Sequence, residues 1–331
     1  MPLLSFGQAT NDAMRVVMRT DPNVFCLGQD LRWGGSFGQF RGLYDEFPDR
    51  ILDMPISEAL IVSAAVGAAA TGMRPVVSMN FVEFAMGAMD EIVNQAAKLR
   101  YMFGGQATVP LVLRCADGII RSAAAQHSES FEALFAHVPG LKVVAPSNSY
   151  DAKGLLIAAI ADDNPVVFLE NKRVQPRKSE VPEGLYEVPL GLAKVIREGR
   201  DLTIVSYSMQ VLNALEAATR LAAEGIDAEV IDLRTIVPFD IETVVTSVRK
   251  TRRAMVCHEA WTFGGFGAEI SSQIHERLFG HLRAPVVRVG ARQSHIPFSP
   301  PLESAVVPGI DDIVRAAHHL VDMNSAPGLV V

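Results

Sequence analysis

The fold is decided by residues 53–77, which read DMPISEALIVSAAVGAAATGMRPVV. Ser57 is a predicted N-cap, and the run of small apolar residues from 58 to 71 predicts a helix. Because this helix is apolar on every side, we expect it to be buried. A short β-branched strand follows at 75–78. A buried helix that leads directly into an apolar strand is typical of an α/β domain with a parallel sheet.

The same alternation continues over most of the chain. Apolar strands separated by helical periodicity indicate parallel sheets that helices cover on both faces. Between residues 171 and 200, prolines and charges predict an inter-domain connection with a small β element. We therefore predict two α/β domains, at 1–185 and 186–323, and a loose tail at 324–331. The predicted strands lie at 24–27, 75–78, 109–113, 141–145, 165–169, 202–207, 228–233, 254–258 and 285–289, and the predicted helices at 8–18, 58–71, 86–102, 130–135, 151–161, 211–224, 241–250, 267–279 and 311–321.

Composition disfavours several classes of protein. The chain has 331 residues, of which 49% are hydrophobic and 20% charged, so a folded globular protein is expected rather than a disordered one. A formal net charge of −7 disfavours nucleic acid as a partner, because phosphate binding needs clustered Lys and Arg. We expect no signal peptide and no membrane span. The three cysteines lie far apart, which predicts reduced thiols and a cytoplasmic location.

Three side chains in the first half are candidates for a cofactor site. Glu58 lies in the first turn of the predicted helix, where a carboxylate can also simply complement the helix dipole. Phe84 follows a predicted strand, at the edge where open α/β sheets bind ligands, although a core phenylalanine would fit the pattern as well. His127 lies in a loop between three alanines and polar residues of the helix-capping type, and its alternative is a surface position.

Several long segments resemble one protein family. They are PISE at 55–58, GAAATGMRPVV at 67–77, NQAAKLRYMFGGQ at 94–106, AAQHS at 124–128, PGLKVVAPS at 139–147, YDAKGLL at 150–156, DDNPVVFLE at 162–170, HEAWTFGGFGAEI at 258–270 and PFSPPLE at 297–303. In these segments the chain resembles the β subunit of the E1 component of thiamine-diphosphate-dependent 2-oxoacid dehydrogenases. The resemblance implies an N-terminal pyrimidine-binding domain with a parallel sheet and a C-terminal α/β domain of the transketolase type.

The resemblance also implies a role for each candidate. Glu58 corresponds to the glutamate that contacts N1′ of the thiamine aminopyrimidine, and Phe84 to the aromatic residue that packs on this ring, with Ile56 nearby. His127 corresponds to a histidine on the substrate side of the cofactor, which assists proton transfer or acyl transfer to the lipoyl arm. The family holds K⁺ through main-chain carbonyls, and the matching positions here are Leu111, Ala159, Asp162 and Asn164.

One missing motif implies that this chain supplies only half of an active site. Thiamine enzymes hold Mg²⁺ and the diphosphate through a Gly-Asp-Gly motif, which this sequence lacks. The family resemblance implies that an E1 α subunit supplies this half in an α2β2 heterotetramer, and that a lipoyl-bearing E2 acyltransferase is a further partner. The segment GGFG at 264–267 is better explained by a tight turn before a helix than by phosphate binding.

Two segments depart from the family pattern. The loop at 115–123 contains two isoleucines and Arg121 where the family has more glycine, and LGQD at 27–30 stands where an acidic GED is common. Arg121 is a candidate contact for a substrate carboxylate or for E2, or a surface residue. The leading hypothesis is oxidative decarboxylation of pyruvate or a branched-chain 2-oxoacid. Acetoin cleavage is the alternative, and a non-catalytic scaffold subunit and a stand-alone transketolase half are less favoured.

Overall fold

The computed structural model describes residues 1–323, which form two compact units. The predicted tail at 324–331 lies outside the described residues. The predicted domain ranges, 1–185 and 186–323, stay a prediction, because each of the two units also contains residues from the other range. Unit 1 consists of Met1–Ile119, Leu134–Leu190 and Ile236–Pro238, and unit 2 of Ile120–Ala133, Gly191–Thr235 and the residues from Phe239 onward.

Unit 1 is built on a seven-stranded sheet in the order β12-β6-β7-β5-β4-β2-β3. The strand pairs from β6 to β3 are parallel, and β5 and β7 are buried at every position, as a sheet covered on both faces requires. This confirms the predicted α/β class. The strands are β2 (Val24–Gly28), β3 (Ile51–Asp53), β4 (Arg74–Met79), β5 (Val112–Asp117), β6 (Lys142–Val144), β7 (Val166–Asn171) and β12 (Thr235–Val237), and β1 (Leu3–Ser5) pairs separately with β8 (Lys178–Glu180).

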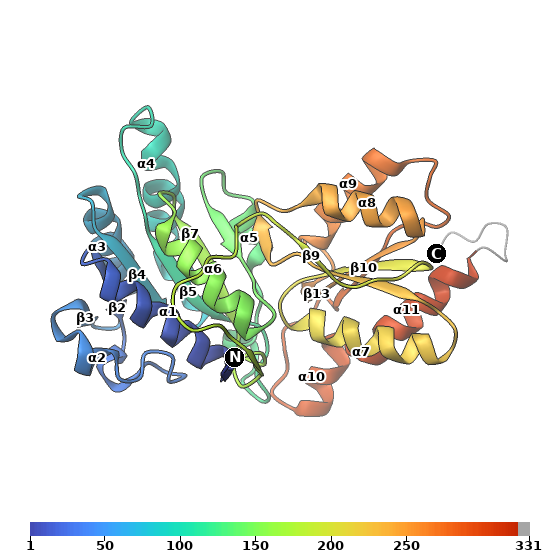
Figure 1. Ribbon diagram of the computed structural model, residues 1–331, viewed down its shortest axis with the longest axis horizontal. Coiled ribbons are helices and arrows are strands. Elements are labelled where there is room, and N and C mark those ends of the chain that lie inside the picture. The colour runs from blue at the N-terminus through green and yellow to red at the C-terminus, as the bar shows by residue number, and fades with distance from the viewer. Residues whose placement is uncertain (324–331) are drawn as a thin grey trace. The chain divides into compact units, whose positions relative to one another are not determined.

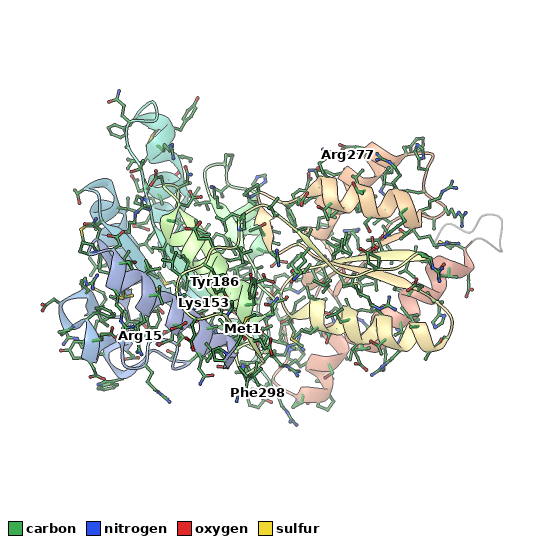
Figure 2. All side chains as sticks on the ribbon, viewed as in Figure 1. Met1, Arg15, Lys153, Tyr186, Arg277 and Phe298 are labelled. Carbon is green, nitrogen blue, oxygen red and sulfur yellow. The ribbon has the colours of Figure 1, made fainter. Side chains whose placement is uncertain are left out.

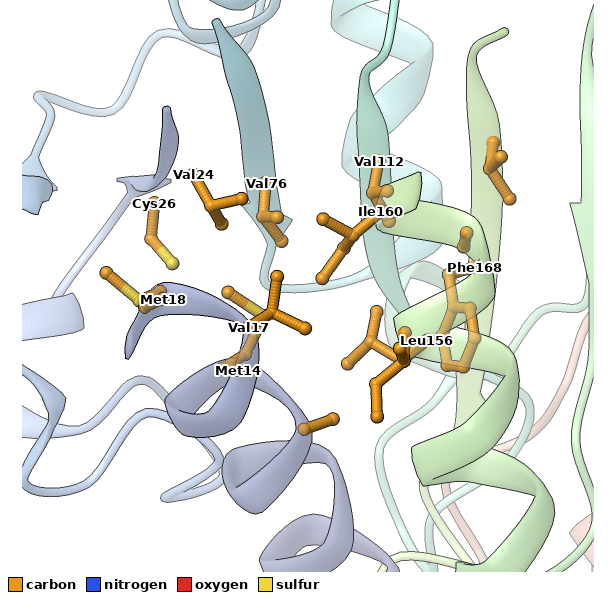
Figure 3. Close-up of a cluster of buried hydrophobic side chains, with 14 of the residues drawn as sticks. Met14, Val17, Met18, Val24, Cys26, Val76, Val112, Leu156, Ile160 and Phe168 are labelled. Atoms are coloured by element: carbon orange, nitrogen blue, oxygen red, sulfur yellow. The ribbon is translucent and has the colours of Figure 1, made fainter. Parts of the chain in front are cut away.

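Two helices, α1 (Phe6–Thr20) and α6 (Ser149–Ala161), pack against each other over one face of this sheet (Figure 3). Both begin at side-chain caps. Ser5 and Gln8 form a reciprocal capping box at α1, and the Asn148 side chain accepts a hydrogen bond from the Asp151 N–H at α6. Apolar residues from both helices and from the strands form the core beneath them. Its labelled members are Met14, Val17, Met18, Val24, Cys26, Val76, Val112, Leu156, Ile160 and Phe168.

A buried lysine ties α6 to α1 beside this core. The Lys153 side chain is inaccessible to solvent, and its Nζ lies 2.7 Å from a carboxylate oxygen of Asp12. The same ammonium lies 5.2 Å from the ring centroid of Tyr186, and Figure 2 labels both side chains. A buried charge is costly unless it is paired, so these contacts compensate the burial of the Lys153 ammonium.

Two elements of unit 1 differ from their predicted form. The predicted helix at 86–102 is a 3₁₀ helix η3 (Val82–Ala88), a π-helical segment η4 (Asp90–Ala96) and a short α4 (Ala97–Met102). Such changes of helix type cluster at functional sites. The predicted strand at 109–113 begins later, at Val112, because Pro110 cannot donate a ladder hydrogen bond, and it extends through the charged Arg114.

Helix α3 (Glu58–Ala70) is less buried than its composition predicts. Only Ile61, Val62, Ala65 and Ala69 are buried, and they face η3, η4 and β4. Leu60 is 48% exposed, and the small residues on the same side are exposed as well. The prediction of a fully buried helix was therefore wrong for this chain by itself, because one chain covers only one side of the helix.

Unit 2 contains a five-stranded sheet in the order β14-β13-β10-β11-β9, parallel except for β9. Helices α7 and α11 pack together on one of its faces, and α8 and α9 pack together on the other (Figure 1). None of the helices within residues 1–323 has the length and apolarity that a membrane span needs. The elements are β9 (Lys194–Arg197), β10 (Leu202–Ser206), β11 (Ala228–Asp232), β13 (Ala254–Trp261), β14 (Val287–Ala291), α7 (Met209–Ala223), α8 (Ile241–Thr251), α9 (Gly267–Leu278), α10 (Pro300–Val306) and α11 (Ile310–Asp322).

A buried histidine explains the GGFG segment before α9. The Nδ1–H of His258 donates to the Ala260 carbonyl at 3.1 Å, and burial lowers the pKa of this imidazole to about 4, so the ring is neutral. A Cβ at Gly265 would lie 2.8 Å from the ring, and one at Gly267 would lie 2.5 Å from Nε2. Only Gly264, with a φ of 69°, meets the expectation of a tight turn.

Replacing Gly267 by alanine is expected to destabilise the chain by about 1–3 kcal/mol, because the new methyl group overpacks the His258 ring. Urea unfolding of the purified chain measures the effect. Gly67→Ala is the matched control, since its Cβ would meet nothing within 4 Å on helix α3. The control should raise stability by up to ~1 kcal/mol. Equal shifts in both variants would contradict the close packing around His258.

Candidate cofactor site

The carboxyl ends of the parallel strands of unit 1 form the edge on which the candidate residues lie. Strands β2, β3 and β4 end in register, with Gly28 opposite both Asp53 and Ser78. Ligands of open α/β sheets bind outside this edge. Glu58 follows β3 and Phe84 follows β4, so both residues come directly after strands that end at this edge.

Glu58 is the first residue of α3 and is half-buried. Ser57 is the N-cap, as predicted, but its side chain makes no capping hydrogen bond. The Glu58 side chain faces η3, where a Cβ at Gly87 would lie 3.7 Å from its Cβ and 3.8 Å from its Oε2. The carboxylate is therefore held between a helix N-terminus and the turn that carries the second candidate.

Phe84 belongs to an edge-to-face group of aromatic rings. Its ring centroid lies 5.6 Å from that of Phe81, at an interplanar angle of 79°, and Phe81 lies 5.8 Å from Phe37. In a 3₁₀ helix, residues three apart share one side, so Phe84 and Gly87 lie on the same side of η3. Glu58 packs beside Gly87, so it lies against the same short helix that carries Phe84.

Ile56 lies in the loop between β3 and α3 and is 82% exposed. An exposed isoleucine two positions before Glu58 continues the uncovered apolar side of α3. Clusters of this kind mark surfaces that bind a ligand or a partner. Ile56 and Leu60 thus expose apolar surface on either side of Glu58 in the chain.

The altered LGQD segment forms a neutral polar network at the same sheet edge. The Asn80 Nδ2 donates to Gln29 Oε1 at 2.9 Å, and the Ser36 hydroxyl donates to Asn80 Oδ1 at 2.8 Å. Gln29 follows β2 and Asn80 follows β4. Gln29 stands at the position of the glutamate in the common GED segment. Its side-chain amide oxygen already accepts a hydrogen bond from Asn80. Sequence reasoning missed Asn80 and Ser36, because their connection spans a long stretch of chain.

His127 ends a short 3₁₀ turn, η5 (Ala125–His127), and is half-buried. It lies in the segment 120–133, which belongs to unit 2, whereas Glu58 and Phe84 belong to unit 1. The segment is fastened to unit 2 near its end. The Tyr207 hydroxyl donates to the buried Glu132 carboxylate at 2.6 Å, and the rings of Phe131 and Trp261 lie 6.4 Å apart. Sequence reasoning gave no signal for these contacts.

Of the four residues predicted to bind K⁺, three lie at the C-terminal end of α6 or just after it, and the fourth, Leu111, precedes β5. Asp162 is the C-cap of this helix, its Oδ1 accepts hydrogen bonds from Asn164, and its carbonyl accepts one from Arg74 at 3.1 Å. The Leu111 carbonyl accepts a hydrogen bond from Val166 at 2.8 Å. Burial alone would raise the pKa of Asp162, but hydrogen bonds from Lys142 and Asn164 outweigh burial and lower it. The Asp162 carboxylate is already paired with Lys142, and two of the carbonyls already accept hydrogen bonds, so K⁺ binding at these four residues stays a prediction.

The chain matches two domain families in order: the transketolase pyrimidine-binding domain over residues 3–177 and the transketolase C-terminal domain over residues 191–313. It is 46% identical over 325 residues to the acetoin:2,6-dichlorophenolindophenol oxidoreductase subunit beta of Cupriavidus necator, covering 95% of this chain and 96% of that protein. It is 45% identical over 315 residues to the pyruvate dehydrogenase E1 component subunit beta of Rickettsia felis, covering 95% and 97%. The chain belongs to this family of β subunits.

Membership in this β-subunit family confirms the resemblance predicted from the sequence. The fold agrees with a solved split-gene transketolase, an inactive β4 tetramer, at a TM-score of 0.77 and 24% identity, covering 97% of this chain and 99% of that one. A likeness at this identity supports the fold alone. The roles of Glu58, Phe84, Ile56 and His127 stay predictions.

Proposed function

We propose that this β-family chain is one half of a thiamine-diphosphate-dependent E1 enzyme that decarboxylates a 2-oxoacid and passes the acyl group to a lipoyl-bearing E2. The observation that carries the proposal is that Glu58, which follows β3, packs against η3, the helical turn after β4 that carries Phe84. A carboxylate beside an aromatic ring suits a flat, basic heterocycle such as an aminopyrimidine.

The residues present fit the aminopyrimidine end of thiamine diphosphate. Glu58 would hold N1′ and keep a proton on it, Phe84 would pack against the ring, and Ile56 would exclude water beside it. When bound, this cofactor supplies the carbanion chemistry of the reaction. The task of this chain is to orient the ring and to set its protonation from a carboxylate fixed at a helix end.

The diphosphate end requires a second polypeptide. The sequence has no Gly-Asp-Gly motif, and the apolar side of α3 and Ile56 are uncovered in this chain. We propose that an E1 α subunit covers this apolar surface and holds Mg²⁺ and the diphosphate in an α2β2 heterotetramer. E2 is the proposed acyl acceptor. K⁺ at the Leu111, Ala159, Asp162 and Asn164 carbonyls is part of the proposal. A cytoplasmic location is supported by three free, buried cysteines in the described chain.

Acetoin cleavage is the second candidate, because one relative of 46% identity is named for acetoin. Co-expression of the chain with its α subunit and assay on pyruvate, branched-chain 2-oxoacids and acetoin separates the two. The leading proposal expects the highest kcat/KM on a 2-oxoacid. Preference for acetoin would select the alternative, and no turnover of any of them would favour a scaffold subunit.

Replacing His127 by alanine should lower the rate of lipoyl acylation by about 10²–10⁴-fold, the range of a lost proton-transfer group. Thiamine diphosphate affinity should stay near that of the wild type, since the residue is assigned to the substrate side of the cofactor. Single-turnover acylation and calorimetry on the assembled complex measure the two quantities. An equal loss of cofactor affinity would contradict the assigned role.

A further inference from the structure

The loop before His127 has backbone conformations that favour glycine at positions that are not glycine. Ser122 has a φ of 62°, and Ala124 has φ 60° and ψ −167°, a combination that is nearly restricted to glycine. The family has more glycine in this loop. A conformation that glycine adopts freely must therefore be enforced here by contacts from outside the loop.

One buried carboxylate makes such a contact. Glu303 lies in α10, is 5% exposed, and accepts a hydrogen bond from the Ser122 N–H at 3.2 Å through Oε2. Both residues belong to unit 2. A charged acceptor strengthens the bond to a main-chain N–H, and the low local dielectric strengthens it further. Glu303 thus holds the loop at the first of its two strained residues.

The strained turn is connected directly to the histidine. The His127 N–H donates to the Ala124 carbonyl at 3.3 Å, which closes the turn between them. Beyond the histidine, the buried pair of Tyr207 and Glu132 fastens the other end of the segment. His127 therefore lies between two fixed points, and the one that opposes the backbone strain is Glu303.

We propose that Glu303 is a positioning residue, which holds the Ser122–Ala124 turn and thereby sets the orientation of His127. The inference rests on the proposed function, in which His127 acts on the substrate side of the cofactor. It adds that the second unit of the β chain controls the geometry of this histidine through one carboxylate in the PFSPPLE segment.

The test uses variants of the assembled α/β complex. Glu303→Ala should lower kcat for lipoyl acylation about ten- to a hundredfold, the loss expected when a reacting group is misplaced by up to about 1 Å, with unchanged thiamine diphosphate affinity. Glu303→Gln keeps an oxygen acceptor and should recover most of the rate. In the Glu303→Ala background, replacing Ser122 and Ala124 by glycine should also recover the rate. Glycine adopts positive φ values without support from a neighbouring side chain. Glu276→Ala, an exposed glutamate on α9, is the matched control.

A second readout is independent of turnover. Peptide mass spectrometry measures the rate at which diethyl pyrocarbonate modifies His127. This rate should differ from the wild-type rate in Glu303→Ala and be restored to it in the glycine variant. Wild-type kcat and an unchanged modification rate in Glu303→Ala would overturn the proposal. So would a parallel loss of cofactor affinity that glycine does not rescue. If His127→Ala kept full turnover, the assigned role of His127 would fail, while the modification rate would still decide the role of Glu303.

Discussion

Glu58→Ala in the assembled complex is expected to lower kcat by about 10²–10⁴-fold while the fold stays intact. Glu58 is a half-buried residue at the start of α3, beside the turn that carries Phe84. No other acidic side chain follows β3 or begins α3, so the loss has no substitute within this element. Steady-state kinetics on the preferred substrate measures the effect, and circular dichroism checks the fold.

Two comparison variants sharpen the test of Glu58. Glu58→Gln keeps the size and a hydrogen bond but cannot share a proton, so its activity should stay close to that of Glu58→Ala. Glu242→Ala is the control, since Glu242 is also a first-turn glutamate but lies on α8 with its side chain 81% exposed. Near-normal turnover of Glu58→Ala would show that another acid protonates the cofactor.

The largest effect on stability is expected from Glu170→Ala. Arg114 donates to Glu170 Oε1 through Nε at 2.9 Å and through Nη2 at 2.6 Å, and both side chains are almost inaccessible to solvent. Nη2 also donates to the Thr10 hydroxyl at 3.0 Å, and the guanidinium lies 4.7 Å from the Phe40 ring centroid. Removing the carboxylate leaves an uncompensated buried charge, which costs about 3–5 kcal/mol.

Thermal unfolding of the purified chain measures the loss, and a decrease in melting temperature on the order of 10 °C is expected. Asp163→Ala is the matched control, because Asp163 pairs with Arg74 at 2.8 Å but has its side chain 53% exposed. Exposed ion pairs contribute about 0–1 kcal/mol to stability, so the melting temperature of the control should change little. Similar shifts in both variants would contradict the account of the buried pair.

The sequence was sufficient for features that depend on local pattern. The alternation of strands and helices predicted the α/β class of both units, and the position of Phe84 after β4 follows from chain order. Long-range pairs could not be predicted. Glu303 and Ser122 lie 181 positions apart, and the match of a carboxylate to one strained N–H leaves no periodicity in the sequence. The exposed side of α3 was also missed, because its cover is assigned to another chain.

The central claim is that this chain holds only the aminopyrimidine end of the cofactor site. Isothermal titration calorimetry with thiamine diphosphate and Mg²⁺ tests it most directly, on the purified β chain and on the assembled α/β complex. We predict binding to the complex at least about a hundredfold tighter, or ~2.8 kcal/mol, than to the β chain by itself. Equally tight binding to the β chain alone would contradict the claim.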